Sequence, residues 1–206
     1  MQKDWKRMFL VGRRGFTLIE LILVVAVVAI LAAILVPTVF SILDESAVTK
    51  GTADVKAIAG SIVKFRKDVG EFPTRQSDAD AEVNMLYSGT TAPGAADFSA
   101  VGVTPFDCSA AGECESFVFP FFTNSPTGAG VAYSTTGKKQ WKGPYLSGND
   151  VDEFDTPYIA YVRRLQRAGG VTTERAWVVF AGENQLYETT PGHTSAQGDD
   201  IVFLIK

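Results

Sequence analysis

The apolar positions of the chain follow three patterns along its length. The stretch from Thr17 to Val36 is twenty residues long and carries one charged residue, Glu20. A helix of that length spans about 30 Å, the thickness of a hydrocarbon core. From Val55 to Val69 apolar residues recur every three or four positions, which predicts that the helix continues with one apolar face. Beyond Trp141 short runs of β-branched and aromatic residues predict strands.

The second pattern predicts a helix face that packs against a small sheet rather than a groove for a partner. Its apolar positions are Val55, Ile58, Ile62, Phe65 and Val69. Gly70 and Pro73, in "VGEFPT", are expected to end this helix, because glycine favours a left-handed cap and proline cannot continue the ladder.

In the third pattern, "PYIAYVRRL" and "RAWVVFAG" predict a hairpin, and "DDIVFLIK" predicts a last strand or a closing segment. Residues 75–137 are rich in Gly, Ser, Thr, Ala and Pro, which predicts loops with short strands or helical turns. Within them, "AEVNMLY" is expected to form a short helix. The aromatic "ESFVFPFFT" either packs on the core or covers a neighbouring molecule, and the core is favoured because aromatic clusters usually bury.

Charge is divided unevenly along the 206 residues, whose net charge is −4. The first fifteen residues carry a net +4 and the remainder a net −8. A basic N-terminus before an apolar run holds that terminus in the cytoplasm, so the rest of the chain is expected across the membrane. The acidic remainder offers no basic field for nucleic acid.

The two cysteines, Cys108 and Cys114, lie in "FDCSAAGEC" without the further cysteine or histidine of a metal site. A disulfide is favoured in an oxidising compartment, with free thiols as the alternative. The single histidine, His193, lies in a turn-rich "TPGHTS". No nucleophile elbow, phosphate loop or zinc pattern is present, so we do not expect an enzyme; a membrane-tethered enzyme is the alternative of a different class.

The stretch "RRGFTLIE" directly before the apolar run resembles the processing signal of type IV pilins and pseudopilins. The resemblance implies that a prepilin peptidase cuts after Gly15 and methylates the new N-terminus, Phe16. It also assigns the family's glutamate to Glu20 and its frequent helix proline to Pro37. Pro37 is either simply tolerated in the membrane helix or allows a local kink or unwinding during assembly.

An unpaired carboxylate inside a membrane is costly, and the apolar helix itself offers Glu20 no cation. In a helical filament Glu20 of one subunit can pair with the Phe16 amine of a neighbour. The buried carboxylate would then set the register between subunits, because only a correctly placed neighbour satisfies it.

Further stretches resemble the major pseudopilins of the type II secretion system, namely "KFRKDVGEFPT", "WKGPYL" and the order of a hairpin, a polar loop and paired aspartates. The resemblance is strong over residues 1–74 and moderate over 141–206. It does not cover 75–137, which has the character of an enlarged insertion. The family's Asp-Pro-Trp-Gly segment is altered here to "DEFDTPY".

The resemblance also implies a structural calcium ion in the polar loop "FAGENQLYETTPGHTSAQGDDI". Carboxylates, amides and carbonyls suit this hard cation. The alternative is a solvated acidic turn without metal. By position, the ligands would be the side chains of Asn184, Asp199 and Asp200 and the backbone carbonyls of Ala181 and Leu186.

The expected fold is therefore α+β and pilin-like: a long N-terminal helix, half membrane-spanning and half amphipathic, packed on a small C-terminal antiparallel sheet. The expected segments are a leader (1–15), the membrane and assembly helix (16–43), its amphipathic half and end (44–74), a loop-rich insertion (75–140), and the sheet with the calcium loop (141–206).

The expected function is that of a structural subunit of a periplasmic pseudopilus that drives protein secretion. The alternatives are a subunit, major or minor, of a surface type IV pilus and a binding module at a filament tip. The expected partners are further copies of the chain, the prepilin peptidase, the inner-membrane assembly platform and minor pseudopilins. Before assembly the chain is expected to cross the bacterial inner membrane once, with its C-terminal domain in the periplasm.

Overall fold

A computed structural model describes residues 15–75, 82–98, 108, 113–124, 132–167 and 170–205. The predicted leader up to residue 14 lies outside the described residues, as do several stretches of the predicted insertion. Contacts between residues divide the chain into two units, one ending at Leu43 and one beginning at Asp44. We call the second unit the head.

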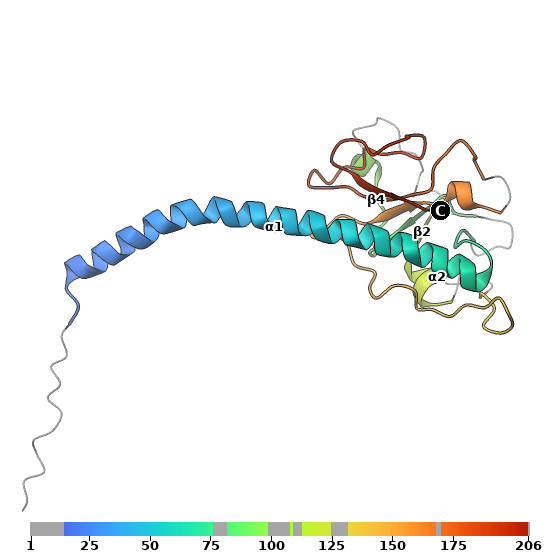
Figure 1. The fold of residues 1–206 in the computed structure, drawn as a ribbon, viewed down its shortest axis with the longest axis horizontal. Coiled ribbons are helices and arrows are strands. Elements are labelled where there is room, and N and C mark those ends of the chain that lie inside the picture. The colour runs from blue at the N-terminus through green and yellow to red at the C-terminus, as the bar shows by residue number, and fades with distance from the viewer. Residues whose placement is uncertain are drawn as a thin grey trace, which may run out of the picture. The chain divides into compact units, whose positions relative to one another are not determined.

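Helix α1 runs from Leu18 to Val69, a length of 52 residues, and therefore contributes to both units (Figure 1). Pro37 lies inside it without interrupting the helix. The predicted stop at Gly70 is confirmed: this residue has φ +98°, and its N–H donates to the Arg66 carbonyl at 2.8 Å. The left-handed backbone that closes the helix is one that glycine adopts without a steric penalty.

The head contains a five-stranded sheet in the order β2-β1-β3-β4-β5. Its strands are β1 (Met85–Tyr87), β2 (Cys114–Ser116), β3 (Ile159–Tyr161), β4 (Trp177–Phe180) and β5 (Ile201–Leu204). The predicted pairing of the two strands after Trp141 is confirmed, since β3 pairs antiparallel with β4. The predicted last strand is also confirmed, because β5 pairs antiparallel with β4.

Two expectations about the sheet are wrong. It is mixed rather than antiparallel, because β1 and β2 run parallel. Both of these strands come from the predicted insertion, and the residues of β1 were expected to be helical. Met85 and Leu86 are both fully buried and lie in different hydrophobic clusters, so each contributes to a core. Tertiary pairing with β3 thus decides the conformation of a segment too short to show a period.

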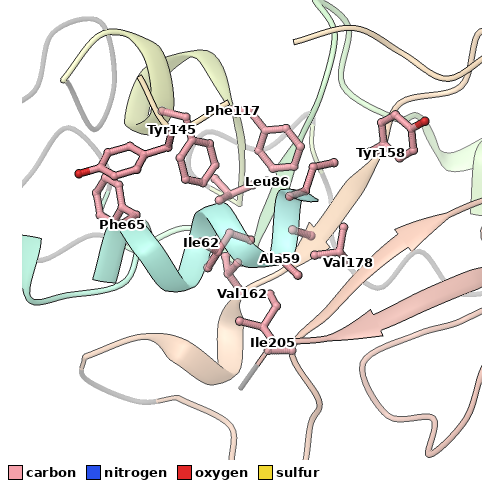
Figure 2. Packing of buried hydrophobic residues seen from close by; sticks show 14 of the residues in the cluster. Ala59, Ile62, Phe65, Leu86, Phe117, Tyr145, Tyr158, Val162, Val178 and Ile205 are labelled. Carbon is pink, nitrogen blue, oxygen red and sulfur yellow. The ribbon is translucent and has the colours of Figure 1, made fainter. Parts of the chain in front are cut away.

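One face of the sheet packs against the head portion of α1, and Figure 2 shows this core. The predicted stripe is confirmed, since Val55, Ile58, Ile62 and Phe65 are buried and Val69 packs against the cluster. Fully burying one such side chain stabilises the fold by roughly 1.5–3 kcal/mol. The sheet residues facing this stripe include Leu86, Ala160, Val178 and Phe180.

The aromatic segment also belongs to this core, as favoured from the sequence. It forms the short helix α2 (Val118–Phe122), and both Phe117 and Phe121 are fully buried. Phe65 lies edge-on to Phe121, with ring centroids 5.9 Å apart, and edge-on to Tyr133 at 4.9 Å. Edge-to-face pairs of this kind contribute about 0.5–1.5 kcal/mol beyond simple burial.

The opposite face of the sheet is covered as well. Along β4 the side chains alternate between the two clusters, with Trp177 and Val179 on the side away from α1. There they meet Phe98, from the 3₁₀-helix η1 (Ala95–Phe98), and Tyr187, from the polar loop. The rings of Phe98 and Tyr187 lie 5.1 Å apart. A strand buried on both faces shows no alternation of apolar and polar residues.

Candidate functional site

The apolar segment, Phe16–Leu43, presents its side chains outward. Phe16 is 89% exposed, and even Val27, the most covered large apolar residue of the segment, is 49% exposed. Within the described part of the chain, α1 is the helix whose length and composition would allow it to cross a membrane. A contiguous apolar surface of this extent requires lipid or other apolar helices around it.

Glu20 lies in the first turn of α1 and closes a capping box with Thr17. Its Oε2 accepts hydrogen bonds from the Thr17 N–H and the Thr17 hydroxyl, each at 2.8 Å. The Thr17 hydroxyl oxygen in turn accepts from the Glu20 N–H at 3.3 Å. The carboxylate is thus held at the positive end of the helix in a single subunit, without a cationic partner among the described residues. Thr17 was not assigned a role from the sequence, although a threonine three positions before a glutamate is the signature of this motif.

Gly15 and Phe16 precede α1 in irregular backbone. A Cβ built on Gly15 would meet no atom within 4 Å, so the described residues leave this peptide bond uncovered. The two predicted processing residues therefore lie directly before the helix that carries Glu20.

In the polar loop each predicted ligand side chain accepts a hydrogen bond from a backbone N–H. Asp199 Oδ2 accepts a hydrogen bond from the Asn184 N–H at 3.0 Å. Asn184 Oδ1 accepts from the Leu186 N–H at 2.7 Å. Asp200 Oδ2 accepts from the backbone N–H groups of Glu188, at 2.8 Å, and Thr189. Ala181 follows β4 directly and is fully buried.

Asp200 is the most unusual group of this loop. Asp200 is 5% exposed, and its Oδ1 is buried with no hydrogen-bond partner. Burial raises the pKa of the Asp200 carboxyl to about 6, although the backbone N–H groups oppose that shift. A buried carboxylate oxygen without a donor is a group that a cation would satisfy.

Glu188 joins the same cluster and was not predicted from the sequence. Its Oε2 accepts from Asn184 Nδ2 at 3.3 Å and from the Asp199 N–H at 3.2 Å. Gly182 and Gly198 have positive φ, and a Cβ at either would collide with the Asp199 or Glu188 carboxylate. Among the described residues no three carboxylate, imidazole or thiol groups converge on one point, so a cation here would depend on amide and carbonyl oxygens as well.

The remaining candidates make other contacts. Cys108 and Cys114 form a disulfide with their Cα atoms 5.1 Å apart, which is the pairing favoured from the sequence. His193 is half-buried in a turn, where its Nδ1 accepts from the Thr190 N–H at 3.1 Å.

Comparisons with known proteins agree with the N-terminal features. Residues 11–36 match the family described as the prokaryotic N-terminal methylation motif. A type II secretion system core protein G of Pseudomonas aeruginosa is 42% identical over 69 residues, covering 34% of this chain and 49% of the relative. Its namesake in Aeromonas hydrophila is 30% identical over 70 residues, covering 34% and 49%. That of Escherichia coli K12 is 26% identical over 90 residues, covering 44% and 60%.

The chain thus spans about half of the length of the curated relatives it matches. No solved structure matches it. The long apolar helix with its early glutamate and the small sheet packed on the second half of that helix give the chain an α+β, pilin-like fold, and the methylation motif precedes it. Over the matched stretches the chain is similar to core proteins G of type II secretion systems.

Proposed function

We propose that the chain is a structural subunit of a periplasmic pseudopilus that drives protein secretion. One observation carries this proposal: an apolar helical surface, exposed along its whole length, begins directly after the processing residues and carries Glu20 in its first turn. Such a surface suits a helix that is stored in a membrane and then transferred into a bundle of identical helices.

Assembly uses the two residues at the start of this helix. Cleavage after Gly15 exposes the Phe16 amine, which is a cation at the edge of the apolar segment. Glu20 then exchanges part of its capping box for the amine of a neighbouring subunit. Because a carboxylate surrounded by apolar helices is costly without a cation, the neighbour is held in one register. Pro37 is either tolerated here or gives the helix the freedom to unwind locally during this transfer.

The partners that this function requires are further copies of the chain, a prepilin peptidase, the inner-membrane assembly platform and minor pseudopilins. The apolar helix, which is the membrane-span candidate among the described residues, and the basic N-terminus support a chain that crosses the bacterial inner membrane once, with its head in the periplasm. The relatives, which are named as core proteins of a secretion system, support a structural rather than an enzymatic role. The names of the relatives favour secretion over a surface type IV pilus.

We further propose that a calcium ion stabilises the polar loop. The side chains of Asn184, Asp199 and Asp200 would hold it, with the carbonyls of Ala181 and Leu186. The partnerless Oδ1 of Asp200 supports this ligand set, because the buried oxygen lacks a donor without a cation. The ion would tie the two ends of a loop of about twenty residues to the end of β4, a structural role only.

The experiment is to replace Glu20 by Ala or Leu in a host whose secretion depends on this chain. We expect the variants to insert and to be processed but to form few filaments and release little exoprotein. Glu45→Ala is the matched control, because Glu45 is an exposed acid of the same helix beyond the apolar segment. Normal filaments and normal secretion with Glu20→Ala would contradict the proposed function. If cells that lack this protein still secrete normally but lose a surface fibre, that result would support the pilus alternative.

A further inference from the structure

A group of arginines lies at the C-terminal end of α1 in the head. The helix enters the head at Asp44 and ends at Val69, and its C-terminal end lies beside a groove of about 580 Å³ lined by Arg66, Arg164 and Arg175. Phe72, Leu204 and Ile205 give this basic groove an apolar lining. The chain beyond residue 15 carries a net negative charge, so a groove lined by three arginines differs in sign from the chain as a whole.

None of the three arginines is paired with a carboxylate among the described residues. The Arg66 guanidinium rests 4.5 Å from the Phe72 ring centroid, and that of Arg175 lies 5.6 Å from the Trp177 ring. Arg164 Nη1 donates to the backbone carbonyls of Thr172 and Glu174, at 2.8 and 2.6 Å. Arg66 and Arg164 are exposed. These contacts position the guanidinium groups and leave their charge without a neutralising partner.

An acidic loop lies near the other end of the head portion of α1. Asp150, Glu153 and Asp155 are exposed, and Glu153 forms an ion pair with Lys50. Lys50 is sixteen residues before Arg66 on α1, which places the loop roughly 24 Å along the helix from the basic groove. Asp54 and Asp44 add further negative charge to this end of the helix, whose bases are Lys50 and Lys56.

We propose that the basic groove of one subunit receives the acidic loop of a second copy of the chain. This inference rests on the proposed function. In a filament joined by Glu20 and the Phe16 amine, all helices run in the same direction, so the groove end of one head faces the loop end of another. A contact between two different surfaces of identical subunits is heterologous and can repeat without closing, as a filament requires. Opposite charges on the two surfaces set the register between heads and offset the repulsion between acidic subunits.

The test uses the full chain in the secretion-competent host, with filament yield as the readout. Arg66→Glu and Asp150→Arg are each expected to reduce filament yield about tenfold, because each places like charges across the contact. Combining the two substitutions is expected to restore most of the yield, since the pair is then reversed rather than lost. Arg66→Lys should assemble nearly normally.

Lys138→Glu is the matched control, because Lys138 is exposed and does not line the groove. A second measurement is independent of charge: Ser147→Cys with Thr194→Cys should give a ladder of cross-linked multimers under mild oxidation, whereas each single variant stops at dimers. Ser147 neighbours the acidic loop, and Thr194 lines the groove; both are exposed.

The inference is overturned if the single reversals assemble normally, if the double reversal is no better than either, if Lys138→Glu is equally harmful, or if no ladder forms. In each of these cases wild-type filaments still form, and the proposed function stands. If the wild-type chain forms no filaments, the proposed function fails and the inference fails with it.

Discussion

Gly51 lies in α1 where the helix crosses the Phe180 ring, and replacing it by alanine tests how tightly the head is packed. A Cβ at this position would lie 2.7, 2.8 and 2.9 Å from three atoms of that ring, closer than carbon atoms normally approach. The ring has little freedom to move away, because Phe180 is fully buried. It also stacks on Phe154, with centroids 6.2 Å apart, and lies 6.0 Å from the Tyr158 ring.

Two effects of opposite sign determine how Gly51→Ala changes the free energy of unfolding. Alanine in place of glycine inside a helix stabilises by about 1 kcal/mol through propensity. Overpacking a dense core costs about 1–3 kcal/mol. Gly51→Ala should therefore leave the head between unchanged and about 2 kcal/mol less stable. Gly60, on the same helix, is exposed and would give its Cβ no neighbour within 4 Å. Gly60→Ala should then show only the propensity gain of about 1 kcal/mol.

Urea unfolding of the unit from Asp44 onward measures both variants, since the described core lies within that unit. The two alanine variants are expected to differ by about 1–3 kcal/mol, with similar dependence on denaturant concentration. Equal stabilisation by Gly51→Ala and Gly60→Ala would refute the packing of Phe180 against α1.

Three further outcomes follow from the head. Burial raises the pKa of the Asp152 carboxyl above its ordinary 3.8, so the folded head retains a proton that the unfolded chain has lost. The stability of the head should therefore fall as the pH rises above 3.8, and Asp152→Asn should flatten this part of a pH profile of urea midpoints. Replacing Cys108 and Cys114 by alanine opens a loop of sequence separation 6 and should lower the unfolding free energy by about 2 kcal/mol; an unchanged urea midpoint would contradict this. Calcium should raise the melting temperature of the head, and Asp199→Ala should abolish the gain; a melting curve indifferent to calcium would remove the proposed ion.

The long helix could be predicted from the sequence because its signals are local. The apolar run from Thr17 to Val36 has the length of a membrane span, the stripe from Val55 to Val69 has the helical period, and Gly70 marks the stop. The strands of "PYIAYVRRL", "RAWVVFAG" and "DDIVFLIK" were found because each contains a compact run of β-branched and aromatic residues.

The strands β1 and β2 could not be predicted, because three residues are too few to show a period and both faces of the sheet are buried. Their conformation comes from pairing with each other and with β3, which lies more than forty residues further along the chain than β2.

The side-chain clusters of the head could not be predicted either, because they depend on contacts between residues far apart in the sequence. Glu188 reaches Asp199 only because the polar loop folds back on itself, and Arg66 and Arg164 meet at one groove although nearly a hundred residues separate them. In contrast, Gly15, Phe16 and Glu20 form one contiguous motif, so the candidate assembly site was readable from the sequence alone.

Assembly as proposed requires that the cation created at Phe16 satisfies the carboxylate of Glu20 in a neighbouring subunit. The most direct measurement is the intact mass and N-terminal sequence of the chain purified from a host with an active prepilin peptidase. The mature protein is expected to begin at a methylated Phe16, with residues 1–15 removed. A chain that still begins at Met1 in that host would contradict it, because the amine that Glu20 requires would never form.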